Sequence, residues 1–111
     1  RENMKILACH FGNPWIMETA ELLYTYPNVS ADISGLITGA SSAYSRQYRD
    51  YLAKRLSEAI YYMGNADKVL FGTDYPVESY SSGLDLARRL KIQSSDLQKI
   101  LHDNAARVFS L

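Results

Sequence analysis

Three short runs typical of β-strands constrain the fold of this chain more than any other feature. The first and third are mainly apolar, the second alternates apolar with small or polar residues, and a stretch of helical periodicity follows each of them. The runs occupy residues 5–9, 29–35 and 68–74, and each reaches a Gly or Pro within a few residues. Helical patterns follow from about Pro14, from about Arg46 to Met63 and through Leu84 to Leu90, before a last one near the C-terminus. Strand and helix in alternation predict parallel strands joined by right-handed crossovers. We therefore expect one α/β domain over residues 1–111 with three parallel strands.

Local signals give more detailed expectations. The run 5–9 is apolar after Lys5, which is typical of a strand buried on both faces. Asn13 is a candidate N-cap with Pro14 in the first helical position. Ser95 and Gln98 have the spacing of a capping box that opens the last helix. The stretch from Leu36 to Ser45 is rich in Gly, Ser, Ala and Thr and predicts a loop.

Apolar stripes indicate which helix faces are buried. In the first helix, the predicted buried residues are Ile16, Ala20, Leu23 and Tyr24. In the second, they are Tyr48, Leu52, Leu56, Ala59 and Ile60. In the last, they are Leu97, Ile100, Leu101, Ala105, Val108 and Phe109.

Composition excludes several classes of function. The 111 residues include 12 basic and 12 acidic side chains, so the formal net charge is zero, and no basic cluster suits nucleic acid or an anionic membrane. No apolar run approaches the roughly 20 residues of a membrane helix. The only cysteine, Cys9, excludes an internal disulfide framework and fits a reducing cytoplasm. Nine tyrosines are many for this length and suggest a wet or interfacial surface as well as a core.

Two polar residues stand where an apolar run stops. His10 follows the first run, and Asp74 ends the third. Because ligands and catalytic groups gather at the carboxyl ends of parallel strands, both side chains should lie on the same rim. A His and an Asp there can share a metal or act as an acid/base pair. The plainer interpretations are a hydrogen-bonded loop histidine and an aspartate that holds its own turn before Tyr75-Pro76.

Other polar or reactive residues receive plainer assignments. Asp32, inside the second predicted strand, is a third candidate that faces either the barrel interior or solvent. Cys9 is expected to be a small buried hydrophobe and not a nucleophile. Asn104 is expected to cap a nearby loop, and His102 to be an exposed helix residue.

Four segments together resemble amidohydrolase family 2. The segment Leu7-Ala8-Cys9-His10-Phe11-Gly12-Asn13-Pro14-Trp15 is similar to the family's sixth strand and loop, and 27–35 to its seventh strand. Residues 69–76, Val-Leu-Phe-Gly-Thr-Asp-Tyr-Pro, resemble its eighth strand and are the most specific part, while 100–111 resemble its closing helix. The resemblance covers essentially the whole chain in order. It implies the last three βα units, strands six to eight, of a (β/α)8 TIM barrel.

The resemblance also implies a function. Such proteins are metal-dependent hydrolases and decarboxylases, so the expectation is metal-assisted hydrolysis of a small carboxylated or cyclic substrate, or its non-oxidative decarboxylation. By this likeness, Asp74 binds the divalent metal, expected to be zinc, and helps to activate its water. His10 is a catalytic acid/base or, in some relatives, a metal ligand. Trp15 and Tyr75 border the substrate pocket.

The chain departs from the family pattern in one important respect. The His-x-His after the first strand and the ligand from the fifth strand are missing, and catalytic zinc usually takes three protein ligands. Its first residue is not Met, which suggests an upstream part. The isolated chain is expected to be inactive, and to form a homo-oligomer or to need the remainder of the barrel. The rival interpretations are a non-catalytic α/β interaction module and a structural fragment.

Overall fold

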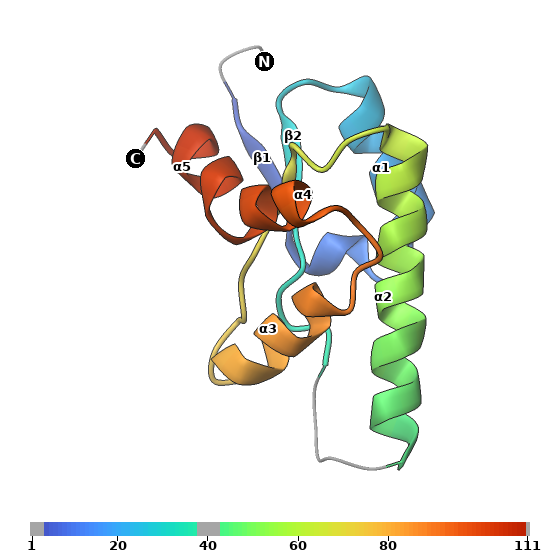
Figure 1. Ribbon diagram of the computed structural model, residues 1–111. Coiled ribbons are helices and arrows are strands. Elements are labelled where there is room, and N and C mark those ends of the chain that lie inside the picture. Colours follow the sequence, from blue (N-terminus) through green and yellow to red (C-terminus); the bar gives the residue numbers. More distant parts are fainter. Residues whose placement is uncertain (1–3, 38–42, 111) are drawn as a thin grey trace.

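The computed structural model describes residues 4–37 and 43–110, and its centre is one parallel sheet (Figure 1). The strands are β1 (Ile6–Ala8), β2 (Val29–Asp32) and β3 (Val69–Leu70), paired in the order β1-β2-β3. Ile6 aligns with Val29, and Ala31 with Val69. The parallel arrangement predicted from the alternation of strands and helices is therefore confirmed, although each strand is shorter than its apolar run.

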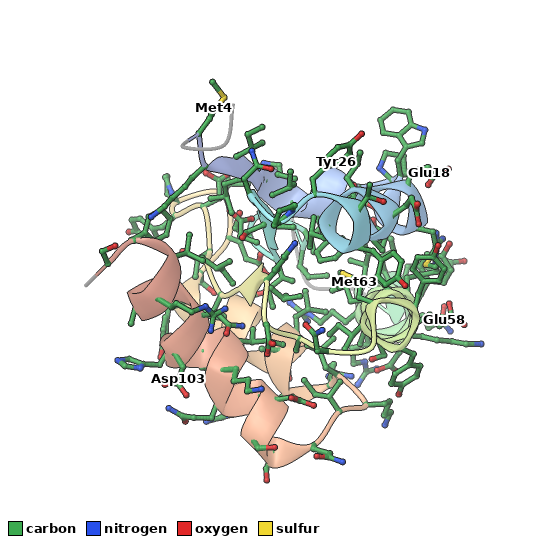
Figure 2. The ribbon with its side chains drawn as sticks, turned by 90° about the horizontal axis from the view of Figure 1, so that it is seen from above. Met4, Glu18, Tyr26, Glu58, Met63 and Asp103 are labelled. Atoms are coloured by element: carbon green, nitrogen blue, oxygen red, sulfur yellow. The ribbon has the colours of Figure 1, made fainter. Side chains whose placement is uncertain are left out.

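Helices lie on two sides of this sheet. They are α1 (Ile16–Thr25), α2 (Ala43–Met63), α3 (Tyr80–Arg88), α4 (Ser94–Gln98) and α5 (Asn104–Val108), with a 3-10 turn η1 (Cys9–Gly12) and a π-helical turn η2 (Lys99–Asp103). In both overall views α1 and α2 lie together on one side, and α5 lies on the other (Figures 1 and 2). Contacts agree, because α1 packs on β2 and α2, while η2 and α5 pack on β3. None of the helices in the described ranges is both long and apolar enough to cross a membrane.

The core confirms most of the predicted helix faces. Side chains that become buried between the sheet and the helices include Ile16, Ala20, Leu23, Leu52, Leu56, Ala59, Ile60 and Ile100. Three predicted members are wrong, since Tyr24, Tyr48 and Phe109 are exposed. Each lies at the margin of its stripe, where the ring can stay at the surface; for a tyrosine this also leaves the hydroxyl in water.

The prediction that the first strand is buried on both faces is wrong. Ile6 is 45% exposed and Leu7 is 38% exposed. Among the described residues, β1 has a strand neighbour on one side only, so its other edge is open. Cys9, which directly follows β1, is exposed and not buried as expected.

Two predicted helix starts are also wrong. Helix α1 begins at Ile16 after Trp15 and has no side-chain cap, because Asn13 and Pro14 belong to the preceding turn. Helix α4 begins at Ser94 after Gln93, so Ser95 lies inside the helix and no capping box forms. Of the predicted loop from Leu36 to Ser45, residues 38–42 lie outside the described residues, while Leu36 and Ile37 are buried.

Asn104 joins the C-terminal helix to β3, as the expectation of a capping role requires. Its side chain is fully buried, and Nδ2 donates to the carbonyl oxygens of Ala66 at 2.7 Å and Val69 at 2.8 Å. Replacing Asn104 with leucine keeps the volume but leaves both carbonyls without this donor. We expect the free energy of unfolding to fall by about 1–3 kcal/mol in urea titrations. The control, Gln98→Leu at an exposed position of α4, should stay within about 0.5 kcal/mol of wild type.

Candidate active site

His10 is held by an unusual turn at the carboxyl end of β1. Three successive residues, His10, Phe11 and Gly12, have φ values of 59°, 49° and 65°, in the left-handed region. The backbone N–H of Asn13 donates to the carbonyl of His10 at 2.9 Å and closes the turn. Left-handed backbone is costly for residues with a Cβ, and the complete burial of the Phe11 side chain offsets that cost.

One carboxylate oxygen ties this turn to the next strand. Oδ1 of Asp32, the last residue of β2, accepts hydrogen bonds from the backbone N–H of His10 at 2.9 Å and of Ser34 at 3.1 Å. It also accepts the hydroxyl proton of Ser34 at 2.6 Å. The charge of Asp32 is the main cause that raises the pKa of the Cys9 thiol, so Cys9 is disfavoured as a thiolate nucleophile. Asp32 therefore holds the backbone of His10 and of Ser34 in place.

The hydrogen bonds of the His10 ring define its neutral tautomer. Nδ1 lies 2.6 Å from the carbonyl oxygen of Ser34, and a carbonyl oxygen only accepts. Nδ1 must therefore carry the proton in the neutral ring, which leaves a lone pair on Nε2. Nε2 lies 3.9 Å from Oδ2 of Asp74. The two side chains are 43% and 48% exposed, so this pair lies at a surface that is open to solvent.

Asp74 reaches this position through a turn of its own. It follows β3 with φ 59°, and the N–H of Val77 donates to its carbonyl at 2.8 Å. The Thr73 hydroxyl accepts from the N–H of Tyr75 at 3.2 Å. The main chain and Thr73 thus make the turn, and the Asp74 carboxylate is left to face His10. The predicted placement of His10 and Asp74 on one rim is confirmed, while their chemical roles stay predictions.

Gly35 lies against the side chains of both His10 and Asp74. It was not identified as a site residue from the sequence. It has φ +60°, and its N–H donates to the Thr73 carbonyl at 3.2 Å. A Cβ at this position would lie 2.8 Å from Cε1 of His10 and 3.1 Å from Oδ2 of Asp74. The only signal in the sequence is that a glycine ends the second predicted strand, directly after the polar Ser34.

The donor atoms suit part of a metal site. Two ligands about 2.1 Å from one tetrahedral ion lie roughly 3.4 Å apart, so a separation of 3.9 Å needs only a small rotation of one side chain. Imidazole nitrogen and carboxylate oxygen are ligands of zinc and of other divalent metals. Within residues 4–37 and 43–110, however, no group of three or more His, Cys, Asp or Glu side chains is placed to hold an ion. The described residues therefore fit as two ligands of an incomplete set.

The remaining predicted site residues are less defined. Trp15 and Tyr75 are both strongly exposed, and each lies close in sequence to one of the two site residues. Their proposed contact with substrate stays a prediction. Asn104 is structural, and His102 is exposed beside Asp103, as expected.

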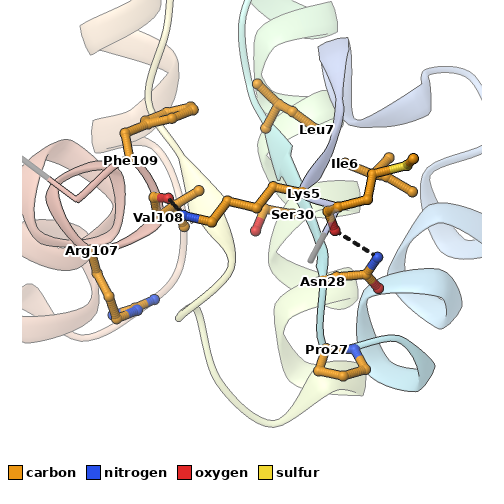
Figure 3. A pocket seen from close by; sticks show the side chains of 10 residues that line it. Lys5, Ile6, Leu7, Pro27, Asn28, Ser30, Arg107, Val108 and Phe109 are labelled. Atoms are coloured by element: carbon orange, nitrogen blue, oxygen red, sulfur yellow. Dashed lines mark hydrogen bonds between the residues drawn. The ribbon is translucent and has the colours of Figure 1, made fainter. Parts of the chain in front are cut away.

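A groove of about 450 Å³ lies away from these residues, between β1 and α5 (Figure 3). Its walls include Ile6, Leu7, Val108 and Phe109, and Lys5 spans it, with Nζ donating to the Val108 carbonyl at 2.6 Å. Neither His10 nor Asp74 lines it. Ser30 of β2 also lines the groove, so it lies beside β1 and apart from the two predicted site residues.

Comparison with known proteins now identifies the family. The sequence model of the amidohydrolase family, Amidohydro_2, matches residues 2–111. The chain belongs to the amidohydrolase family. No curated protein matches this amidohydrolase chain.

Solved structures show which fold the amidohydrolase chain shares. An amidohydrolase from Burkholderia multivorans with bound zinc superposes with a TM-score of 0.75 at 20% identity, over 96% of this chain and 44% of its own. An uncharacterised TIM-barrel protein from Bordetella bronchiseptica gives 0.65 at 23% identity, over 98% and 35%. A dihydroxybenzoic acid decarboxylase from Polaromonas sp. JS666, with manganese and the inhibitor 2-nitroresorcinol, gives 0.66 at 23% identity, over 96% and 34%. The chain thus has the fold of part of a TIM barrel and spans less than half the length of these structures.

Proposed function

We propose that this chain forms strands six to eight of an amidohydrolase-type barrel that hydrolyses a small carboxylated or cyclic substrate with the help of a divalent metal. The observation that carries the proposal is the pair formed by His10 Nε2 and Asp74 Oδ2, 3.9 Å apart at the carboxyl ends of β1 and β3. The Ser34 carbonyl directs the Nε2 lone pair toward Asp74, as metal binding or proton transfer requires.

The residues present have distinct parts in such a reaction. Asp74, alone or with His10, would hold the metal, which when bound supplies a Lewis acid and lowers the pKa of water. Asp74 can accept a proton at Oδ2. His10 can accept or return a proton at Nε2, while Asp32 and Ser34 keep its ring in place. Trp15 and Tyr75 are proposed to border the substrate. Zinc is the metal that we propose; the structures compared above carry zinc or manganese.

Non-oxidative decarboxylation is the second candidate, favoured by the likeness to the Polaromonas decarboxylase. Loss of carbon dioxide leaves an electron pair on carbon that must be protonated. A protonated His10 can deliver that proton from Nε2. The same two residues therefore serve either reaction, and the part of the pocket outside this chain would decide between them.

The proposed partner is the remainder of the barrel. The open edge of β1, the exposed Ile6 and Leu7, and the adjacent groove provide an unpaired strand with apolar surface, which favours association. The two site residues also need at least one further ligand. Preceding βα units would supply a partner strand for the open edge of β1 and the missing metal ligand. Without these units the chain is expected to be inactive.

The proposal is tested with His10→Asn in the complete barrel. Asparagine tolerates left-handed backbone, and its amide keeps a donor for the Ser34 carbonyl, but nothing replaces Nε2. We expect kcat to fall by about 10²–10⁴-fold, the range for loss of an acid/base group. His102→Asn, which changes the exposed histidine, is the control and should keep wild-type turnover. Equal turnover in both variants would show that His10 has no catalytic part.

A further inference from the structure

A stripe of aromatic and charged side chains, exposed except for the half-buried Arg55, runs along the outer face of α2. The stripe consists of Tyr44, Tyr48, Tyr51, Arg55, Glu58 and Tyr62. Successive members are four, three, four, three and four residues apart, which is the spacing of a coiled-coil seam. The four tyrosines are 41–81% exposed. In the view that looks nearly along α2, Glu58 points away from the rest of the chain (Figure 2).

The stripe has the composition of a binding surface. Tyrosine and arginine are enriched at the energetic centres of protein interfaces. Most of its side chains are already ordered, because the rings of Tyr48 and Tyr51 stack with centroids 6.3 Å apart. Arg55 lies over the Tyr51 ring and donates to the Tyr51 hydroxyl at 2.8 Å. Tyr62 donates to Glu21 at 2.5 Å. Rings held in place lose little entropy on binding.

We infer that this stripe is a dimer interface, on which α2 of a second copy of the chain packs antiparallel. In the register of full overlap, Tyr44 lies opposite Tyr62 of the second copy, Tyr48 opposite its Glu58, and Tyr51 opposite its Arg55. Every member of the stripe then meets another member. The two-fold symmetry of such a pair is the commonest symmetry of homo-oligomers.

Charge complementarity selects this orientation. Each guanidinium would lie between its own Tyr51 ring and that of the other copy, a favourable cation–π arrangement. Each Glu58 carboxylate would accept a hydrogen bond from a Tyr48 hydroxyl. A parallel pair in register would instead place Arg55 against Arg55 and Glu58 against Glu58, and like charges directly opposed are destabilising.

The surface is also large enough to contribute to a stable dimer. Helix α2 has 21 residues, so it is about 30 Å long. A fully buried aromatic side chain removes about 150–250 Å² from water. The exposed parts of four tyrosines, with Arg55 and Glu58, thus provide several hundred Å² per copy, approaching the roughly 800 Å² of a standard interface. The stripe lies on a different element from the groove beside β1, so this inference does not depend on the proposed function.

Sedimentation velocity tests the interface with a matched pair of variants. Tyr51 is 51% exposed and lies on the stripe, while Tyr26 is 52% exposed and lies beyond the end of α1. We expect Tyr51→Ser to raise the dimer dissociation constant by at least about tenfold and Tyr26→Ser by less than about twofold. A monomeric wild type at all concentrations, or equal effects of both variants, would overturn the inference. Circular dichroism confirms that both variants fold.

Cross-linking tests the orientation. In a Cys9→Ser background, Tyr48→Cys combined with Glu58→Cys should give a covalent dimer on mild oxidation. Within one chain these positions are ten residues apart, about 15 Å along the helix, too far for a disulfide. Tyr48→Cys with Asp103→Cys, which lies on the far side of the molecule (Figure 2), is the control. Failure of the first pair to cross-link any better than the control would exclude the antiparallel register.

Discussion

Replacing Asp74 with asparagine in the complete barrel is expected to lower kcat by at least about 10²–10⁴-fold and to lower metal content as well. The substitution keeps the shape of the side chain but removes its negative charge and its basicity. The turn should survive, because the Asp74 carbonyl and the Thr73 hydroxyl make its hydrogen bonds without the carboxylate. Steady-state kinetics and elemental analysis of the purified protein give the two quantities.

The same change in residues 1–111 alone provides the control. The described residues supply two ligands of an incomplete set, so metal content should be low before and after the substitution. Near wild-type turnover and metal content in the complete Asp74→Asn enzyme would refute the assignment of Asp74. Tight zinc binding by the short chain would instead refute the claim that its ligand set is incomplete.

Replacing Gly35 with alanine is also expected to cause a large loss of activity, although Gly35 has no side chain that could take part in the reaction. The new Cβ would lie 2.8 Å from Cε1 and 2.9 Å from Nδ1 of His10, so the ring or the loop must move. A displacement of about 1 Å can cost about 10²-fold in rate, and we expect a loss in kcat/KM of at least this size. The left-handed φ adds about 1–2 kcal/mol of destabilisation.

Gly64 offers a matched control for this experiment. It also has a left-handed φ, of +84°, but a Cβ there would have no heavy atom within 4 Å. Gly64→Ala should therefore lose a similar amount of stability in urea titrations and almost no activity. If Gly35→Ala lost no more activity than Gly64→Ala, the contact between Gly35 and the two site residues would not matter for catalysis.

The sequence predicted the parts of the site that depend on strand ends. His10 and Asp74 could be placed because the ends of parallel strands share a rim, whatever the details of the turns. Ser34 and Gly35 could not be assigned, because their contacts depend on left-handed turns after two different strands. Ordinary turn residues give no sign of such three-dimensional contacts.

Predictions of burial failed for a different reason. The apolar run before His10 indicated a strand covered on both faces, yet Ile6 and Leu7 are substantially exposed. Apolar side chains show that a strand is suited to burial, but not that its partners are present. Among the described residues, β1 has a neighbouring strand on one side only. The failed caps at Asn13 and Ser95 show that capping residues identify a helix start only to within a few positions.

The order of pairing within the sheet also bears on how the chain is made. Among the described strands, β1 pairs with β2 and β2 with β3, so neighbours in the sheet are also neighbours in the order of synthesis. Helix α1 lies between the first pair in sequence and packs on β2, so the first crossover is closed by residues that emerge together. These three strands can therefore pair one after another in the direction of translation.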